Sequence, residues 1–269
     1  MLHVAQTCNL LYRRTALGAG LLLLCAFAFN VHAQKTLAPS TETLSPAEAA
    51  KQGHALAAEI LAQQPAGDAT STGVMTITDA KGKRTRIPLA VKITVTATNW
   101  EISYEATTTN GPEKLSKIWR PNAAGELSYK SALPLTNDSG LNDKMDKLFD
   151  MPFAGSDFSV GDLDLYFFGW PDQKVLKHEM RRSRACTVLE SINPHPTPGG
   201  YSRVVSWIDN ESHGIAMAQA YDFKGKLLKE FIPKKFEKVN GQWQLQEMEI
   251  DNDQSDSSTR VDFNVNAPK

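Results

Sequence analysis

Residues 87–106 read IPLAVKITVTATNWEISYEA, and this stretch decides the class of fold. Apolar and polar residues alternate through two runs, which Thr98-Asn99 separates. Alternation with a period of two is typical of a strand that buries one face and exposes the other. The apolar face of the two runs carries Val91, Ile93, Val95, Ile102 and Tyr104. The stretch therefore predicts two neighbouring antiparallel strands with one apolar side.

The same alternation recurs along most of the chain. Turn sequences such as Asp222-Phe223-Lys224-Gly225 and Asn240-Gly241 separate the runs and favour hairpins. Further strands are expected near residues 72–78, 115–119, 127–129, 174–182, 184–190, 201–209, 215–223, 227–238, 242–250 and 258–265. No repeat with a period of roughly 20–50 residues is visible. The pattern predicts a mainly β fold, an antiparallel meander of eleven or twelve strands.

One helix is expected before the first strand. Ser45-Pro46 followed by Glu48 is a typical helix start, with serine as the N-cap and proline at the first helical position. Pro65-Ala66-Gly67 ends the helical pattern.

A second helical segment interrupts the strands near residues 140–170. Residues 142–151 have helical spacing, and the most aromatic part of the chain follows them. We expect this insertion to pack across one face of the sheet as a cover, with an apolar side made of Met145, Phe149, Phe153 and Phe158. The fold class predicted is therefore mainly β with a helical cover (α+β).

The first 33 residues have the features of a secretory signal peptide. Arg13-Arg14 precedes an apolar run, and Val31-His32-Ala33 supplies a cleavage site of small residues. Ala26-Phe27-Ala28 is an alternative cleavage site, and a transmembrane anchor is the alternative interpretation, although the run is shorter than the ~20 residues that a span needs. The sequence predicts an exported, periplasmic protein that begins near Gln34, with residues 34–269 as one soluble domain.

The composition narrows the classes of function. The 29 basic and 30 acidic side chains give a net charge of −1, which argues against a nucleic-acid partner. Residues 251–256 begin like a calcium loop but lack the glycine that such a loop needs at its sixth position, and His178 opens a zinc-protease-like segment without its second histidine. Cys186 lies in an apolar run and is expected to be a buried hydrophobic residue. We predict no catalytic residue, no metal site and no cofactor, and so no enzyme.

Two basic runs remain open to two interpretations. The first contains Lys177, Arg181, Arg182 and Arg184, and the second contains Lys229, Lys234, Lys235 and Lys238. Such runs are commonly solvated faces that discourage edge pairing, but they also suit docking to anionic headgroups or to an acidic partner.

A family resemblance adds to this reading. Gly155-Ser156-Asp157-Phe158-Ser159, followed by Asp162-Leu163, resembles a motif of the outer-membrane lipoprotein-sorting proteins, LolA-like relatives of the periplasmic lipoprotein carrier. The order of the surrounding segments is similar too, over roughly residues 70–265, with Tyr221-Asp222-Phe223-Lys224-Gly225-Lys226 and Thr259 among the matching positions. The resemblance implies an unclosed β-barrel whose concave apolar face, covered by helices, accepts acyl chains.

The resemblance and the alternation together give a hypothesis of function. We expect a periplasmic carrier for the acyl chains of lipoproteins or another hydrophobic ligand, with inner- or outer-membrane transport partners. The alternation alone selects the residues of the cavity: Val91, Ile93, Val95, Ile102, Tyr104, Met145, Phe149, Phe153 and Phe158. A tightly packed core is the alternative for these residues, and a lipid or partner sensor of the same fold is the alternative for the function.

Overall fold

The computed structural model describes residues 44–65, 67–119, 127–131, 148–239 and 242–264. The expected signal peptide and Met145 lie outside these ranges, as do residues 142–147 of the expected second helix; residues 148–150, at its end, are helical.

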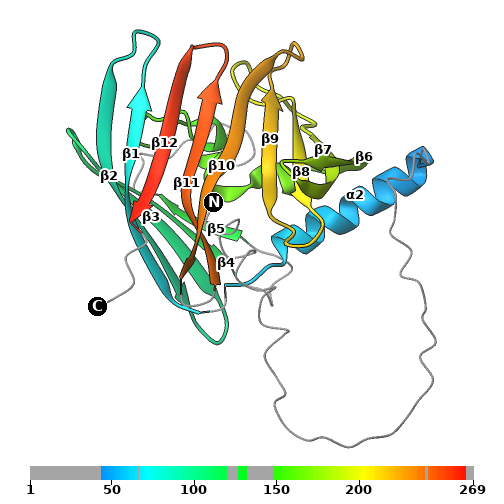
Figure 1. Ribbon diagram of the computed structural model, residues 1–269, viewed down its shortest axis with the longest axis horizontal. Helices are drawn as coiled ribbons and strands as arrows, with labels where there is room; N and C mark the ends of the chain where they lie inside the picture. The colour runs from blue at the N-terminus through cyan, green and yellow to red at the C-terminus, as the bar shows by residue number, and fades with distance from the viewer. Residues whose placement is uncertain (1–43, 66, 120–126, 132–147, 240–241, 265–269) are drawn as a thin grey trace, which may run out of the picture.

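A single antiparallel sheet contains all the described strands (Figure 1). They are β1 (Ala69–Thr78), β2 (Arg84–Val95), β3 (Trp100–Thr108), β4 (Gly111–Trp119), β5 (Leu127–Ser131), β6 (Asp172–Arg181), β7 (Arg184–Ile192), β8 (Arg203–Asp209), β9 (Ile215–Tyr221), β10 (Leu227–Val239), β11 (Gln242–Asn252) and β12 (Ser257–Asn264). Their order is β5-β4-β3-β2-β1-β12-β11-β10-β9-β8-β7-β6. β5 and β6 are the two edges and do not pair, so the curved sheet is an unclosed barrel. This confirms the predicted fold, with twelve described strands.

The register places one continuous apolar surface on the concave side of the sheet. Met75 faces Ile87 and Val261 on the two neighbouring strands, and Val91 faces Tyr104. Because side chains alternate between faces, every second residue of these strands joins the same surface. The apolar alternation of residues 87–106 therefore corresponds to the inside of the barrel, as the sequence predicts.

The N-terminal helix α2 (Pro46–Leu61) packs against the β6 end of the sheet. The Ser45 side chain accepts a hydrogen bond from the Glu48 N–H at 3.3 Å, which confirms the predicted cap. Gly53 lies so close to β6 that a Cβ atom there would be 2.5 Å from the Lys174 Cα. The absence of a side chain at this position allows the helix to approach the strand backbone.

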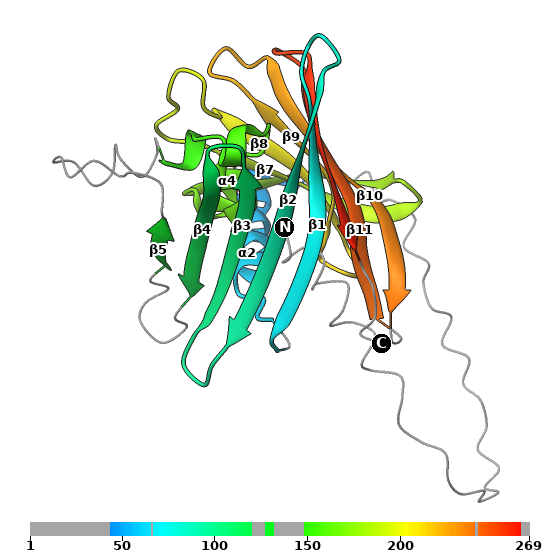
Figure 2. The same cartoon turned by 90° about the vertical axis from the view of Figure 1, so that its left-hand side faces the viewer.

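Residues 148–170 form a compact insertion inside the curve of the sheet. It contains the short helices η2 (Phe153–Gly155), α4 (Val160–Asp164) and η3 (Tyr166–Gly169). Figure 2 shows α4 behind β3 and β4, on the side where α2 also lies. The helical insertion predicted from the aromatic stretch thus packs on the concave face.

The part of the sheet formed by β7, β8 and β9 buries apolar side chains on both of its faces. Tyr201 and Ile208 belong to the inner cluster, whereas Val205 and Trp207 pack with Met217 on the outer face. The Arg181 guanidinium lies 5.4 Å from the centre of the Trp207 ring and covers this outer cluster. The long stem of an arginine can cover apolar surface while its charge stays in water. Cys186 is fully buried in the outer cluster, as predicted.

Candidate functional site

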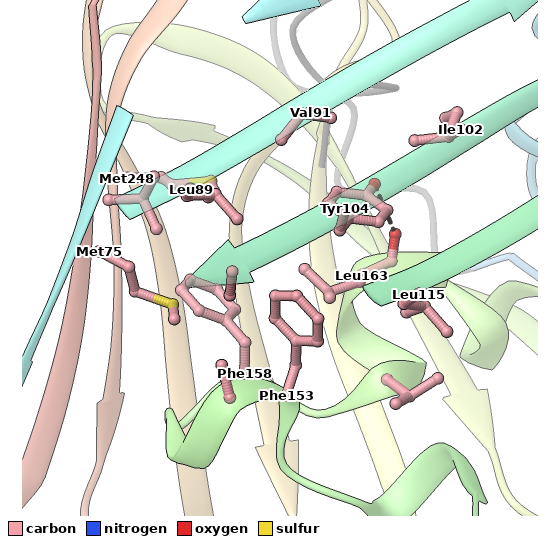
Figure 3. Packing of buried hydrophobic residues seen from close by; sticks show 14 of the residues in the cluster. Met75, Leu89, Val91, Ile102, Tyr104, Leu115, Phe153, Phe158, Leu163 and Met248 are labelled. Carbon is pink, nitrogen blue, oxygen red and sulfur yellow. Dashed lines mark hydrogen bonds between the residues drawn. The ribbon is translucent and has the colours of Figure 1, made fainter. Parts of the chain in front are cut away.

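The concave face and the insertion that covers it form the candidate site. Phe153 and Phe158 point from the insertion toward the strands, where they meet Met75, Leu89 and Tyr104 (Figure 3). The Phe153 ring packs edge-on against Tyr104 with centroids 6.4 Å apart. Both phenylalanines are only 1% exposed. Burial of each such ring contributes about 1.5–3 kcal/mol to the closed arrangement.

Asp157 fixes the insertion to β12 through a compact set of hydrogen bonds. The Thr259 hydroxyl donates to Asp157 Oδ2 at 2.7 Å, and the Ser257 hydroxyl donates to Asp157 Oδ1 at 2.6 Å. In return, the Asp157 backbone N–H donates to Thr259 Oγ1 at 2.9 Å. We call these three residues the Asp157 clamp.

Lys229 of β10 links the Asp157 clamp to helix α4. Its ammonium donates to the Asp157 carbonyl oxygen at 2.7 Å and lies 3.7 Å from Asp162 Oδ2. The side chain is 13% exposed and points into the barrel, so this member of the second basic run is part of the interior and not of a solvated face. A charged group buried to this extent needs such partners, because burial of an unpaired charge is costly.

Asp162 also holds the start of α4 and the loop before β8. Its carboxylate accepts from the Ser159 N–H in a capping box, and the Tyr201 hydroxyl donates to both of its oxygens at 2.9 Å. Burial, together with the neighbouring negative charge of Asp162, raises the pKa of Tyr201 well above its usual value. The phenol therefore stays protonated and keeps donating to Asp162.

Two further hydrogen bonds fasten the insertion to the opposite half of the sheet. Glu113 of β4 accepts from the Ala154 N–H at 2.8 Å, and the Tyr104 hydroxyl donates to the Leu163 carbonyl oxygen at 3.2 Å. The insertion thus rests on apolar contacts and is oriented by a small number of hydrogen bonds, most of them buried.

A pocket lies at the seam between the insertion and β8 to β11. It is narrow, with about 30 Å³ of space that water-sized groups can occupy. Most of its lining is apolar, with Asp162, Tyr201 and Lys229 on one side. The other lining residues are Leu165, Phe167, Val204, Ile215, Ala218, Ala220, Phe231 and Ile250. The two alanines of β9 leave room where larger inward side chains would fill the space.

The cavity residues predicted from the sequence lie together, but in the packed cluster beneath the insertion and not in the lining of this pocket. Seven of them are buried there: Val91, Ile93, Ile102, Tyr104, Phe149, Phe153 and Phe158. Val95 is partly buried against the same cluster, and Met145 lies outside the described residues. Their role as ligand contacts stays a prediction.

Sequence reasoning missed the polar side chains that orient the insertion. Asp157 and Thr259 are 102 residues apart, and Tyr201 and Asp162 are 39 apart. Asp157 and Thr259 both belong to the positions that resemble the family, but nothing in a single sequence shows that they pair.

Neither a metal-binding cluster nor a membrane-spanning helix occurs among the described residues. No group of three or more His, Cys, Asp or Glu side chains within them is placed to hold a metal ion. In the same part of the chain, no helix combines the length and the apolar character needed to cross a membrane.

Comparison with known proteins confirms the resemblance at the level of fold. The structure superposes on a domain described as an outer membrane lipoprotein-sorting protein from Vibrio parahaemolyticus with a TM-score of 0.58 and 19% identity, covering 82% of this chain and 95% of that one. It also superposes on a DUF1329 family protein from Desulfovibrio piger with a TM-score of 0.54, 19% identity and the same coverage of both chains. A family model described as "Uncharacterized protein" matches residues 147–266. No curated protein matches the sequence.

Proposed function

We propose that this protein is an exported carrier that shelters the acyl chains of lipoproteins, or of another amphiphilic ligand, between its concave sheet and the insertion. The observation that carries this proposal is the construction of the cover. A separate segment rests on a continuous apolar face, is oriented by a few hydrogen bonds, and has an apolar pocket at its edge. The fold shared with a lipoprotein-sorting domain supports the same function.

Binding in this proposal is reversible burial without covalent chemistry. Each CH₂ group moved from water into an apolar site contributes about 0.8 kcal/mol. The pocket receives the first part of a chain, and displacement of the insertion exposes the predicted residues, among them Ile93 and Tyr104, to the remainder. Lys229 and Tyr201, at the polar side of the pocket, would contact the ester or amide groups at the head of the ligand.

The cellular setting belongs to the same proposal. Residues 1–33 direct export and are removed, and residues 34–269 work in the periplasm as one domain. The donor and the acceptor of the ligand would be membrane-bound transport components, and the carrier itself performs no catalysis.

The test combines ligand detection with a variant that fills the pocket. Native mass spectrometry of the protein purified from an export-competent host should detect a bound acylated molecule, and a fluorescent fatty-acyl probe should bind the delipidated protein. Ala218→Phe places a ring in the pocket and should weaken probe binding at least tenfold. Ala90→Phe is the matched control, because Ala90 alternates with Leu89 and Val91 and lies on the outer face.

Two outcomes would sink the proposal. One is the absence of both a co-purified ligand and probe binding. The other is equal probe affinity for the folded Ala218→Phe and Ala90→Phe proteins, which would remove the pocket from the binding path.

A further inference from the structure

The hairpin of β6 and β7 carries an excess of positive charge that the interior site does not use. Residues 172–192 contain five basic and three acidic side chains, a local charge of 5 − 3 = +2 in a protein whose net charge is −1, and residues near the tip, 180–184, contain three arginines and no acid. Such segregation of charge favours association with an anionic surface.

The same hairpin also exposes large apolar side chains. Met180 is 64% exposed and Leu176 is 44% exposed, which is unusual for large hydrophobic side chains. Met180 lies between Glu179 and Arg181 near the tip of the hairpin; Lys177 and Arg181 point to the face of the outer cluster, and Met180 points to the opposite face of the hairpin. Apolar side chains set among basic ones suit the interface of a bilayer, where the apolar group enters the headgroup region and the charges meet phosphates.

The tip of the hairpin is held in an uncommon conformation. Arg182 and Ser183 both have positive φ angles, 51° and 62°, at positions where a two-residue turn usually has Asn-Gly. The Arg182 guanidinium donates to the Pro233 carbonyl oxygen of β10 at 2.8 Å, which fixes the tip beside that strand. Figure 2 shows the yellow-green hairpin emerging next to β10. The tip thus brings the two basic runs of the sequence together.

A second hollow lies at this junction. Its empty space is about 580 Å³, its mouth included, and its lining includes Arg182, Arg184 and Lys234 beside Ser212 and Phe236. Asp209 also lines the hollow and pairs with Arg184 at 2.5 Å, and Lys234 pairs with Glu249 at 2.8 Å, so these two cations have fixed positions at the rim and part of their charge is compensated. Phosphate oxygens suit such a rim, because arginine and lysine bind them through charge-assisted hydrogen bonds.

We propose that the β6–β7 hairpin and the neighbouring residues 233–236 of β10 form a docking surface for the anionic phospholipid headgroups of a membrane. Met180 enters the headgroup region, and the surrounding cations contact phosphates. This surface would bring the protein to a bilayer without a spanning helix. It is independent of the acyl pocket, because the pocket lining contains none of these residues.

The experiment is co-sedimentation of the full protein with vesicles of phosphatidylethanolamine and phosphatidylglycerol, and with vesicles of phosphatidylcholine alone. We expect binding only to the anionic vesicles, and its loss at high salt, because screening shortens the reach of exposed charges. A triple variant, Met180→Gln with Lys177→Gln and Lys234→Gln, should weaken binding by at least tenfold, since each cation near an anionic surface contributes about fivefold.

The β9–β10 turn provides a matched control with the same chemistry at the opposite end of the sheet. Phe223 is 52% exposed there, next to Lys224 and Lys226. Phe223→Gln with Lys224→Gln and Lys226→Gln should leave vesicle binding unchanged, and both triple variants should keep their thermal midpoint and acyl-probe affinity. Equal losses in the two variants, or no binding to anionic vesicles at low salt, would overturn the proposal. Binding to an acidic polypeptide without binding to vesicles would assign the surface to a protein partner and overturn it as well.

Discussion

Replacement of Thr259 by valine tests whether the Asp157 clamp holds the insertion closed. Valine has nearly the same shape but lacks the hydroxyl, which in the native protein donates to the Asp157 carboxylate and accepts from the Asp157 N–H. Thr259 is fully buried, so water cannot easily replace the lost partner. A hydrogen bond to a charged group contributes about 1.5–3 kcal/mol, and an unsatisfied buried donor costs about 1–3 kcal/mol. Since Ser257 still serves the carboxylate, we expect a loss of about 2–4 kcal/mol.

The measurement is urea unfolding of Thr259→Val beside Thr76→Val. Thr76 of β1 alternates with the inward Met75, so its substitution changes the outer face. A double-mutant cycle with Asp157→Asn should give a coupling energy above about 1 kcal/mol, because the two residues share one network. If the insertion is also the cover that ligands displace, the acyl probe should bind Thr259→Val faster than the native protein. Equal stability of the two threonine variants, together with additive effects in the cycle, would refute the role of the clamp.

Three further predictions concern other parts of the fold. If Ile93 contacts the ligand, Ile93→Glu should abolish acyl-probe binding while the thermal midpoint shows that the fold survives. If the variant loses both its fold and its probe binding, Ile93 belongs to a packed core. Glu190 is buried, which alone would raise its pKa, but hydrogen bonds from Lys174 and Arg203 outweigh burial and lower it. The ionised Glu190 therefore stabilises the fold above the unfolded pKa of 4.5, and this stabilisation is lost as the pH falls through the folded pKa. Glu190→Gln should cost about 1–2 kcal/mol of unfolding free energy at pH 7 and little in acid, as measured by urea unfolding across that pH range. Gly53→Ala should lower the thermal midpoint by several degrees, because its Cβ would meet the β6 backbone, whereas Gly67→Ala, with open space around it, should change it little.

The sequence was informative wherever one residue and its near neighbours determine the structure. The alternation of residues 87–106 defined two strands and their inward face, and Ser45 defined the start of α2. Predictions that needed two distant segments were beyond its reach. Val205 and Trp207 pack on the outer face because Arg181 covers them, and the alternation along β8 cannot reveal a cover that β6 supplies.

The candidate site shows the same division. The sequence placed the apolar side chains of the insertion, because Phe153 and Phe158 belong to a dense aromatic stretch. It could not show that Lys229 turns inward, because a lysine in a run of lysines is usually solvated. Its inward position depends on the carbonyl of Asp157 and the carboxylate of Asp162, which reach it only after the insertion has folded onto the sheet.

The strand order has a consequence for how this chain folds. Every pairing in the sheet joins strands that are consecutive in the sequence, with one exception, the seam between β1 and β12. At that seam Thr72 faces Asn264, a separation of 264 − 72 = 192 residues. Local hairpins can form each half of the sheet early, whereas pairing β1 with β12 must overcome the entropic cost of closing a very long loop. We therefore expect the seam to form last. Until it does, β1 and β12 both present unpaired edges, and a chain that emerges slowly from an export channel is most prone to aggregate at these two strands.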